Sequence, residues 1–485
     1  MSKQTEHNDT DTEKNVSRMS RREVIALATA ASAAAAGGIY TILSDKESTD
    51  RIRNVDRIDG ENIREYGAEP NPNDPTGAAA QQNLRAIIDA ATEAGNNGQI
   101  YVPSGVYYFG HDGSGVDQYL DFGEREPAGI SIVGDGPEKS VLAVTEHADP
   151  EDQPLQSGPK WSDDHDHGTI NIADIRLDGN YENLGNLREA DGGSWGVQVN
   201  GDGELHLYNA YLRGWHLASV RGGELFRSAK YCTFEDNGIG NHNDTSGDSI
   251  SHHISCKPKE GNEVLVEHCK FLDCAGSAIN IRYNDGVVRL HNCYVEGTGA
   301  NLCKLSAGKL LELRNVYHKA YTRSLESKMA SQSDDTLNFY GKNFIQSLDE
   351  RGEKQVTVDA KNVLTEDIRE YAIQARNAPV NMTGDLVAIR NSNMRYDDQV
   401  IRNRDGGIFR NLQIDRLSVH NSNAEIFGLE QSEGKIKTLR RHGNEGLGVI
   451  GSVTITNDLP GEGSFKPDLP SKDQVGINSS DESLL

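Results

Sequence analysis

The feature that most constrains this chain is a short pattern that repeats between Val264 and Ser306. Each copy holds two apolar stretches separated by a polar residue, then a glycine, then a third apolar stretch. The two copies read VLVEHCKFLDCAGSAINI and VVRLHNCYVEGTGANLCKL. Apolar and polar residues alternate within each stretch, which indicates half-buried strands. Three short strands that recur at a nearly constant interval predict a solenoid, because each repeat buries its apolar side against its neighbours.

A polar residue recurs between the first and second strands of the copies. Asn tolerates the left-handed backbone conformation that a sharp corner requires, and stacked Asn side chains bond each other from coil to coil. We therefore expect a ladder of corner residues along the solenoid. Its predicted members are Asn209, Tyr231, His268, Asn292, Asn315, Asn343 and Asn362.

Composition limits the class of protein and of partner. Hydrophobic residues make up 35% of the 485 residues and Gly occurs 50 times, which suits a slender, turn-rich β structure. The formal net charge is -25, from 74 acidic and 49 basic residues. This balance excludes a nucleic-acid partner, since binding to phosphates needs the opposite sign. It predicts a strongly hydrated surface, as in halophile-like proteins or in an acidic secreted protein.

The N-terminus carries an export signature. Arg21 and Arg22 precede a weakly apolar, Ala-rich run that ends near Leu43. This arrangement resembles a twin-arginine signal, and residues 33–36 offer a cleavage site. An uncleaved membrane anchor is the alternative, because the run is just long enough to span a bilayer. Either way we expect a secreted or cell-surface protein.

A helix and a strand are predicted after a linker at residues 51–60. Thr76 is the expected N-cap, and Gly95 ends the helix. The apolar face of this helix comprises Leu84, Ile87, Ile88, Ala91 and Ala94.

This entrance segment resembles a known superfamily. Residues 66–68 (YGA), the helix start at Asp74 and Thr76, and the VPSGVYYF sequence that begins at Val102 are similar to the first coil of the pectate-lyase-like superfamily. The resemblance spans roughly Asn62 to Asn457. It implies a right-handed parallel β-helix whose open end is capped by the helix. We expect three parts: a signal or anchor with linker at 1–50, the β-helix at 51–457, and a disordered tail at 458–485, where Pro, Gly, Ser and Asp dominate.

Two polar stretches could serve a ligand. Residues 163–167 (DDHDH) form a dense His/Asp cluster, which we interpret as a solvated acidic loop because no partner motif fixes a metal geometry. The long loop from Asp178 to Trp195 carries Tyr181 and Trp195. Aromatic rings of this kind stack on sugars in carbohydrate grooves, although an acidic, mobile loop is an equal alternative.

The third strand of each coil should place polar residues side by side. We take Val220, Ile254, Ile281 and Leu305 as inward positions. One outward row then comprises Ser219, His253, Asn280, Lys304 and Glu326, and the next comprises Arg221, Ser255, Arg282 and Ser306. Adjacent coils lie about 4.8 Å apart, so such neighbours can contact one ligand.

A long insertion at residues 236–248 precedes His252. We expect it to bring acidic and histidine side chains to this face. The candidate catalytic residues are Asp244, Asp248, His252, His253 and Arg282. The candidate substrate-binding residues are Arg221, Asn280, Lys304, Trp195 and Tyr181. A lyase needs a base and cations beside a carboxyl group, and a hydrolase needs two carboxylates. The resemblance places a substrate groove on this face; the alternative is an ordinary surface where these groups pair with neighbouring acids.

The sequence assigns neither a cofactor nor a catalytic motif. The ordered polygalacturonase signature is absent from the sequence, and no calcium-binding Asp set of the pectate-lyase kind is evident, so calcium is only a candidate cofactor and no metal ligand is assigned. The six cysteines lie between Cys232 and Cys303. Since Cys232, Cys269 and Cys293 share one inward register, we predict buried thiols rather than disulfides.

The sequence thus predicts an exported β-helix whose partner is a polysaccharide. The first hypothesis is a lyase or glycoside hydrolase acting on an acidic glycan, and the second is a non-catalytic, adhesin-like surface protein. An acid-free groove would favour the second hypothesis. The sequence does not indicate the glycan or the oligomeric state, because fold does not fix function.

Overall fold

The computed structural model describes most of the chain beyond the N-terminus. The described residues are 60–73, 77–110, 119–122, 128–145, 157–161, 166–180, 195–215, 217–239, 251–282, 285–306, 308–330, 343–348, 355–391, 399–421, 425–442, 446–460 and 467–477. Residues 57–485 form one compact unit. Among the described helices, none is long and apolar enough to cross a membrane.

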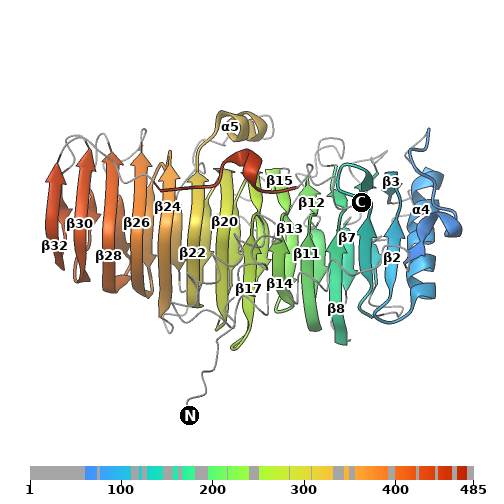
Figure 1. The fold of residues 1–485 in the computed structure, drawn as a ribbon, viewed down its shortest axis with the longest axis horizontal. Coiled ribbons are helices and arrows are strands. Elements are labelled where there is room, and N and C mark those ends of the chain that lie inside the picture. The colour runs from blue at the N-terminus through green and yellow to red at the C-terminus, as the bar shows by residue number, and fades with distance from the viewer. Residues whose placement is uncertain are drawn as a thin grey trace, which may run out of the picture. The chain divides into compact units, whose positions relative to one another are not determined.

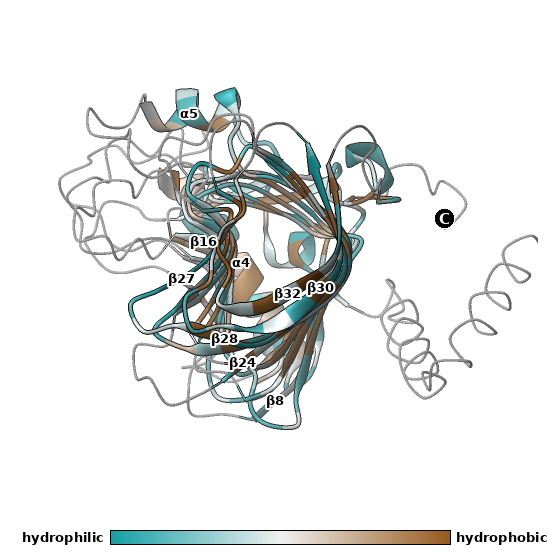
Figure 2. Ribbon diagram, turned by 90° about the vertical axis from the view of Figure 1, so that its left-hand side faces the viewer, coloured by the Kyte–Doolittle hydropathy of each residue, from teal (hydrophilic) through white to brown (hydrophobic). Residues whose placement is uncertain are grey.

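The unit is a right-handed parallel β-helix, as predicted (Figure 1). Two sheets, one of 20 and one of 12 strands, enclose a single apolar core, and every strand pairs in parallel with its counterpart in the next coil. Figure 2 shows the walls: β16 and β27 belong to the 12-stranded sheet, and β24, β28 and β30 to the curved 20-stranded sheet. Each coil contributes its first two strands to the larger sheet and its third strand to the smaller one.

The strands of the larger sheet bend at the corner between the first and second strand of a coil. They are β1 (Glu61–Asn62), β2 (Gln99–Val102), β3 (Gly105–Phe109), β5 (Ser131–Gly134), β6 (Ser140–Val144), β8 (Asp166–Ala173), β9 (Arg176–Asp178), β11 (Asp202–Tyr208), β12 (Tyr211–Arg213), β14 (Phe226–Lys230), β15 (Thr233–Asn237), β17 (Glu263–Glu267), β18 (Lys270–Cys274), β20 (Val287–Thr298), β22 (Gly308–Lys319), β24 (Val356–Glu366), β26 (Pro379–Asn391), β28 (Ile408–Asn421), β30 (Glu433–His442) and β32 (Ser452–Pro460).

The strands of the smaller sheet are the third strands of the coils. They are β4 (Tyr119–Asp121), β7 (Ser157–Trp161), β10 (Trp195–Val199), β13 (Ala218–Gly223), β16 (His252–Cys256), β19 (Ser277–Ile281), β21 (Asn301–Leu305), β23 (Asn343–Leu348), β25 (Tyr371–Arg376), β27 (Ile401–Arg404), β29 (Phe427–Gly428) and β31 (Gly448–Val449). The helical elements are η1 (Ile63–Tyr66), α4 (Gly77–Ala94), α5 (Arg323–Ala330) and η5 (Lys472–Gln474).

The predicted helix is α4, and it lies at one end of the strand array (Figure 1). Leu84, Ile87 and Ala91 are buried and belong to the same apolar cluster as the first strands, because they share one helical face. Gly95 follows the helix with φ of 69°, a left-handed conformation that ends it as expected. The expected N-cap, Thr76, lies outside the described residues.

The corner ladder is confirmed for six of its seven predicted members. Residues 209, 231, 268, 292, 315 and 362 all have positive φ. Asn315 Nδ2 donates to Asn292 Oδ1 at 2.9 Å, and Asn362 Nδ2 donates to Asn315 Oδ1 at 2.7 Å. Asn343 was assigned wrongly: it begins β23 in the other sheet and donates to Asn301 Oδ1.

We expect Asn315→Ala to destabilise the unit by about 1–3 kcal/mol, because Ala resists the left-handed conformation and both ladder bonds are lost. Asn315→Gly keeps the backbone conformation and separates the two effects, so it should fall between Ala and wild type. Urea unfolding midpoints measure the difference. Equal midpoints for Ala and Gly would show that backbone strain contributes nothing.

The cysteine prediction is confirmed. All six cysteines are buried and form no disulfide. Burial raises the pKa of Cys256, Cys274 and Cys293 to about 12, so these thiols stay protonated and unreactive.

The expected disordered tail is corrected at two places. Strand β32 continues to Pro460, and residues 467–477, here called the C-terminal strap, bind along the middle coils (Figure 1). Gly476 N donates to His268 O at 2.7 Å, and Asp468 N donates to Asn362 Oδ1 at 3.0 Å. The strap is ordered because backbone groups and side chains of the corner satisfy its polar atoms.

Candidate functional site

A continuous row of polar residues runs along the outward side of the 12-stranded sheet. Strand pairing places its members side by side in consecutive coils. They are Lys160, Gln198, Arg221, Ser255, Asn280, Lys304, Gln346, Gln374 and Arg402. We call these nine residues the cationic row. Four of these nine are cations, although the chain carries a net charge of -25, and the acidic residue Asp121 occupies the paired position next to Lys160 in the preceding coil.

The local sequence explains why these residues point outward. The flanking residues Ile279 and Ile281 are buried in the core, so Asn280 between them faces the other way. The same alternation around Lys304 involves Cys303 and Leu305. With about 4.8 Å between coils, the nine positions span about 38 Å.

Aromatic rings support two of the four cations. The Arg221 guanidinium lies 4.8 Å from the centroid of the Trp195 ring. The Arg402 guanidinium lies 4.9 Å from the centroid of the Tyr371 ring, and its Nη1 donates to the Tyr371 hydroxyl at 2.8 Å. A ring face orients a guanidinium by cation–π attraction without neutralising its charge.

Arginines of the 20-stranded sheet show a contrasting pattern. Arg416 donates to both carboxylate oxygens of Asp385, at 2.6 and 2.5 Å, and this bond lowers the pKa of Asp385. Arg441 makes the same two-point contact with Asp458. Such pairs cancel charge within the 20-stranded sheet.

His252 lies beside the row and contacts it. Asn280 Nδ2 lies 2.9 Å from His252 Nε2, so Nε2 accepts and the ring proton resides on Nδ1. Burial, followed by the charges of Lys304 and Arg282, lowers the pKa of His252 to about 3. The charges of Lys304 and Arg282 therefore both act on His252. Neither His252 Nδ1 nor Asn280 Oδ1 has a partner among the described residues.

His253 was placed wrongly. The alternation rule assigned it to the outward side, but its ring lies in the core, 5.6 Å from the Phe271 ring and within bonding distance of Asn237 Nδ2. His253 and Ile254 are both fully buried, although they are neighbours within β16. His253 therefore stabilises the interior and does not face a ligand.

The predicted rows also need a correction of register. Asn280 pairs with Ser255 and Lys304, so these three belong to one row rather than two. Glu326 belongs to neither row, because it lies on α5. Three further candidates, Tyr181, Asp244 and Asp248, lie outside the described residues.

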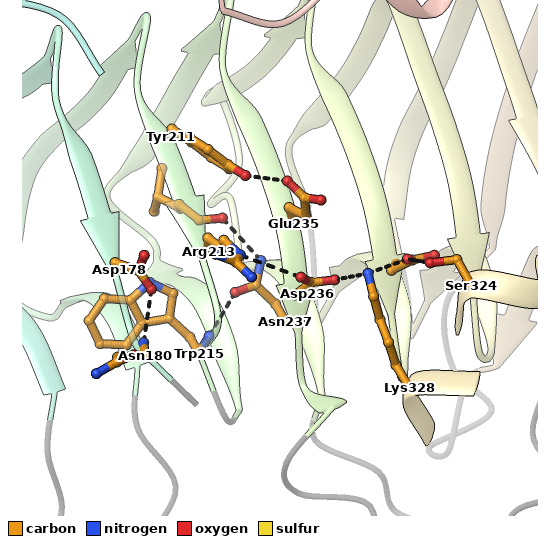
Figure 3. A network of polar contacts seen from close by, with 12 residues as sticks. Asp178, Asn180, Tyr211, Arg213, Trp215, Glu235, Asp236, Asn237, Ser324 and Lys328 are labelled. Carbon is orange, nitrogen blue, oxygen red and sulfur yellow. Dashed lines mark hydrogen bonds and ion pairs between the residues drawn. The ribbon is translucent and has the colours of Figure 1, made fainter. Parts of the chain in front are cut away.

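Helix α5 is anchored in the middle coils, beside the segments that follow β15 and β18. Leu325 and Met329 pack with Ile239 and Ala275, which follow β15 and β18. Lys328 Nζ lies 2.5 Å from Asp236 and 2.6 Å from Asp273. Figure 3 shows Lys328 directed towards Asp236, with Arg213 on the other side of that carboxylate. Asp236 is almost fully buried, and Arg213 contacts its other oxygen at 3.4 Å.

Several residues of the row escaped sequence reasoning. Lys160, Gln198, Gln346, Gln374 and Arg402 lie in coils whose connecting loops differ in length, so their register could not be read from spacing. Across the described part of the chain, no group of three His, Cys, Asp or Glu side chains is placed to bind a metal ion.

Comparison with known proteins gives similarity of structure alone. No family model matches the chain, and no curated protein matches it. A surface adhesin of Streptococcus pneumoniae is 11% identical, with 83% of this chain and 91% of that chain covered and a TM-score of 0.48. A family 28 exopolygalacturonase of Yersinia enterocolitica is 12% identical, with 83% and 76% covered and a TM-score of 0.47. A mannuronan C-5 epimerase A-module of Azotobacter vinelandii is 13% identical, with 83% and 100% covered and a TM-score of 0.31.

Proposed function

We propose that the chain binds an anionic polysaccharide along the cationic row. The observation that carries this proposal is the row itself, which has four cations among nine positions on a chain of net charge -25. Its length of about 38 Å suits an extended polymer rather than a small molecule. Arg221 is exposed, and Lys304 and Arg402 are partly exposed, so a ligand can reach their charges.

Electrostatics favour an acidic ligand over a neutral one. Burial lowers the pKa of His252 most, and the positive charges of Lys304 and Arg282 lower it further. Guanidinium groups bind carboxylates through paired hydrogen bonds, and a positive strip on an acidic surface selects the region where an anion binds.

A polysaccharide lyase is the second candidate. Arg282 and Lys304 concentrate positive charge beside a neutral imidazole, and such charge stabilises the anion formed when a proton is removed next to a carboxyl group. A pKa of about 3 makes His252 a weak base near neutral pH, which argues for binding over catalysis. The lyase proposal therefore depends on Asp244 and Asp248, and a hydrolase would need both as its acid pair.

We also propose membership of the pectate-lyase-like superfamily and export through the twin-arginine route to the outside or the cell surface. The paired residues Arg21 and Arg22 and the entrance segment before β3 support this proposal. An extracellular location brings the row into contact with polysaccharide.

Charge reversal at the centre of the row tests binding. We expect Lys304→Glu to weaken binding of an anionic polysaccharide by about tenfold, equivalent to about 1.4 kcal/mol. Affinity electrophoresis in polygalacturonate or hyaluronan gels, with a neutral glucan gel as reference, measures the change. Lys361→Glu is the matched control, because Lys361 is an exposed lysine on the 20-stranded sheet.

Two results would decide against the proposal. Equal retardation of wild type and Lys304→Glu would remove the row from the binding surface. Release of unsaturated or reducing ends from either polymer would replace the binding role with the catalytic one.

A further inference from the structure

We infer that the last coil of the β-helix docks a second copy of this chain, end to end. This inference is independent of glycan binding. The last coil comprises β31 and β32, at the opposite end of the array from α4 (Figure 1). Helix α4 covers the first coil, and its buried face shares an apolar cluster with the strands beside it. In the described part of the chain, however, β32 pairs with β30 alone and β31 with β29 alone.

Apolar side chains reach the surface at this end. Among the described residues, only Val449 and Leu459 are both large and apolar and yet exposed, with exposed fractions of 53% and 39%. Leu447, Ile450 and Ile455 pack against the core but are only partly buried, because no further coil follows them. Burial of such side chains against another protein is favourable, and their clustering at one end marks an interaction surface.

The edge of the larger sheet is also open to backbone pairing. An edge strand exposes a row of N–H and C=O groups, and proteins usually protect a long edge with lysines, prolines, inward charges or a covering helix. Strand β32 has nine residues, and only Asp458 and the terminal Pro460 are of these kinds. Thr454 and Ile455 are β-branched residues that favour pairing. Strand β32 can therefore accept a further strand.

Charge makes a second copy the expected occupant. Two chains of net charge -25 repel each other over most of their surfaces. Residues 446–460 read GLGVIGSVTITNDLP and hold one charged residue, Asp458, which accepts from Arg441 at 2.8 and 3.0 Å. Two copies can thus meet at this neutral end without opposing like charges, whereas a basic partner would gain more from acidic surface elsewhere. Antiparallel pairing of β32 with β32 about a two-fold axis uses the same groups on both copies.

The C-terminal strap leads away from the last coil. Asp468 binds Asn362, four coils before β32 and about 19 Å along the array. Ile477 contacts Thr233, eight coils before β32 and about 38 Å away. The eight residues after Ile477 extend at most about 28 Å. They cannot reach β32, so the end of this chain is not the occupant.

Sedimentation velocity of the full-length protein over a range of concentrations tests the inference. We expect a reversible equilibrium of monomer and dimer with a Kd of about 10 µM, because the contact combines one strand pair with a small apolar area. Salt should strengthen the dimer, since it screens the repulsion between two acidic chains. Amide hydrogens of β32 should exchange more slowly as the concentration rises, whereas those of the strap should not change.

A charged variant makes the test specific to the last coil. In Val449→Lys/Leu459→Lys both copies carry cations at the contact, and we expect the Kd to rise at least about tenfold. Asn411→Lys/Gln413→Lys is the matched control. It adds the same charge at exposed positions of β28, two coils before β32, and should leave the Kd unchanged. Circular dichroism and melting temperature verify that each variant is folded.

Three results would overturn the inference. A monomer at every concentration would show that the last coil has no affinity for a second copy. An equal Kd for wild type and Val449→Lys/Leu459→Lys would place the contact on another surface. Assembly beyond a dimer would exclude a two-fold contact, because such a contact closes after two copies.

Discussion

Acidification from pH 7 to pH 4.5 is expected to cost the folded β-helix about 3 kcal/mol for each of three buried histidines. Burial lowers the pKa of His252, His253 and His318 from 6.5 to about 3. In the unfolded chain these rings gain a proton as the pH falls below 6.5, whereas in the folded chain they stay neutral. Protons therefore favour the unfolded state between about pH 6.5 and pH 3, and stability falls as the pH falls.

His318→Gln tests this expectation at one position. The Thr298 and Thr365 hydroxyls each lie 2.9 Å from a ring nitrogen of His318, and Gln can bond to both without titrating. The stability advantage of wild type over the variant should shrink by about 3 kcal/mol between pH 7 and pH 4.5. Urea unfolding at both pH values measures it.

An exposed histidine provides the control for acid sensitivity. His420 is exposed on β28, so His420→Gln is the matched surface substitution against which the profile of His318→Gln is compared. A profile of His318→Gln parallel to that of His420→Gln would contradict the assignment of acid lability to buried rings.

Replacement of Lys328 by Met is expected to destabilise the protein by about 3–5 kcal/mol, because two largely buried carboxylates then lose their counter-ion. The Asp236 side chain is 3% exposed and the Asp273 side chain 10% exposed. Burial raises the pKa of Asp236 against the opposing bond from Lys328. Although burial opposes it, the two carboxylates raise the pKa of Lys328, so this ion pair persists until the pH exceeds 10.5.

The Lys328 prediction has a local and a global readout. Amide hydrogens of α5 should exchange faster in Lys328→Met, because the helix then loses its ion pairs and keeps the packing of Leu325 and Met329 and the Ser324 bond to Asp273. Asp236→Asn in the same chain should recover part of the lost stability by removing one uncompensated charge. Lys361→Met should change stability by less than about 1 kcal/mol, because that lysine is exposed. If Lys328→Met also cost less than about 1 kcal/mol, Asp236 and Asp273 would have to find other partners in the variant.

Local periodicity predicted the repeat, the corner ladder and the buried thiols. Each depends on residues a few positions apart: alternation within β17 or β19, and a left-handed residue such as Asn292 between two strands. These patterns can be recognised within a single coil, without knowing how the neighbouring coil is aligned.

Contacts between distant coils were harder to predict. His253 and Ile254 are both buried although they are adjacent in β16, and the His253 ring bonds to Asn237 of β15, which simple alternation cannot express. Arg402 joined the row only through the register of its strand, because the connecting loops vary in length. The strap was missed because its order comes from His268 and Asn362 rather than from its own composition.

The strap can form its contacts only after the middle coils have folded. Ile477 N donates to Thr233 Oγ1, a contact between residues 244 positions apart, and Lys472 lies 3.2 Å from Glu296. These partners belong to different coils, so the last residues find their full set of contacts only when the middle of the array has already wound correctly. If the middle coils fold incorrectly, the strap stays unbound and accessible to proteases. In the correctly folded protein the strap is bound and protected.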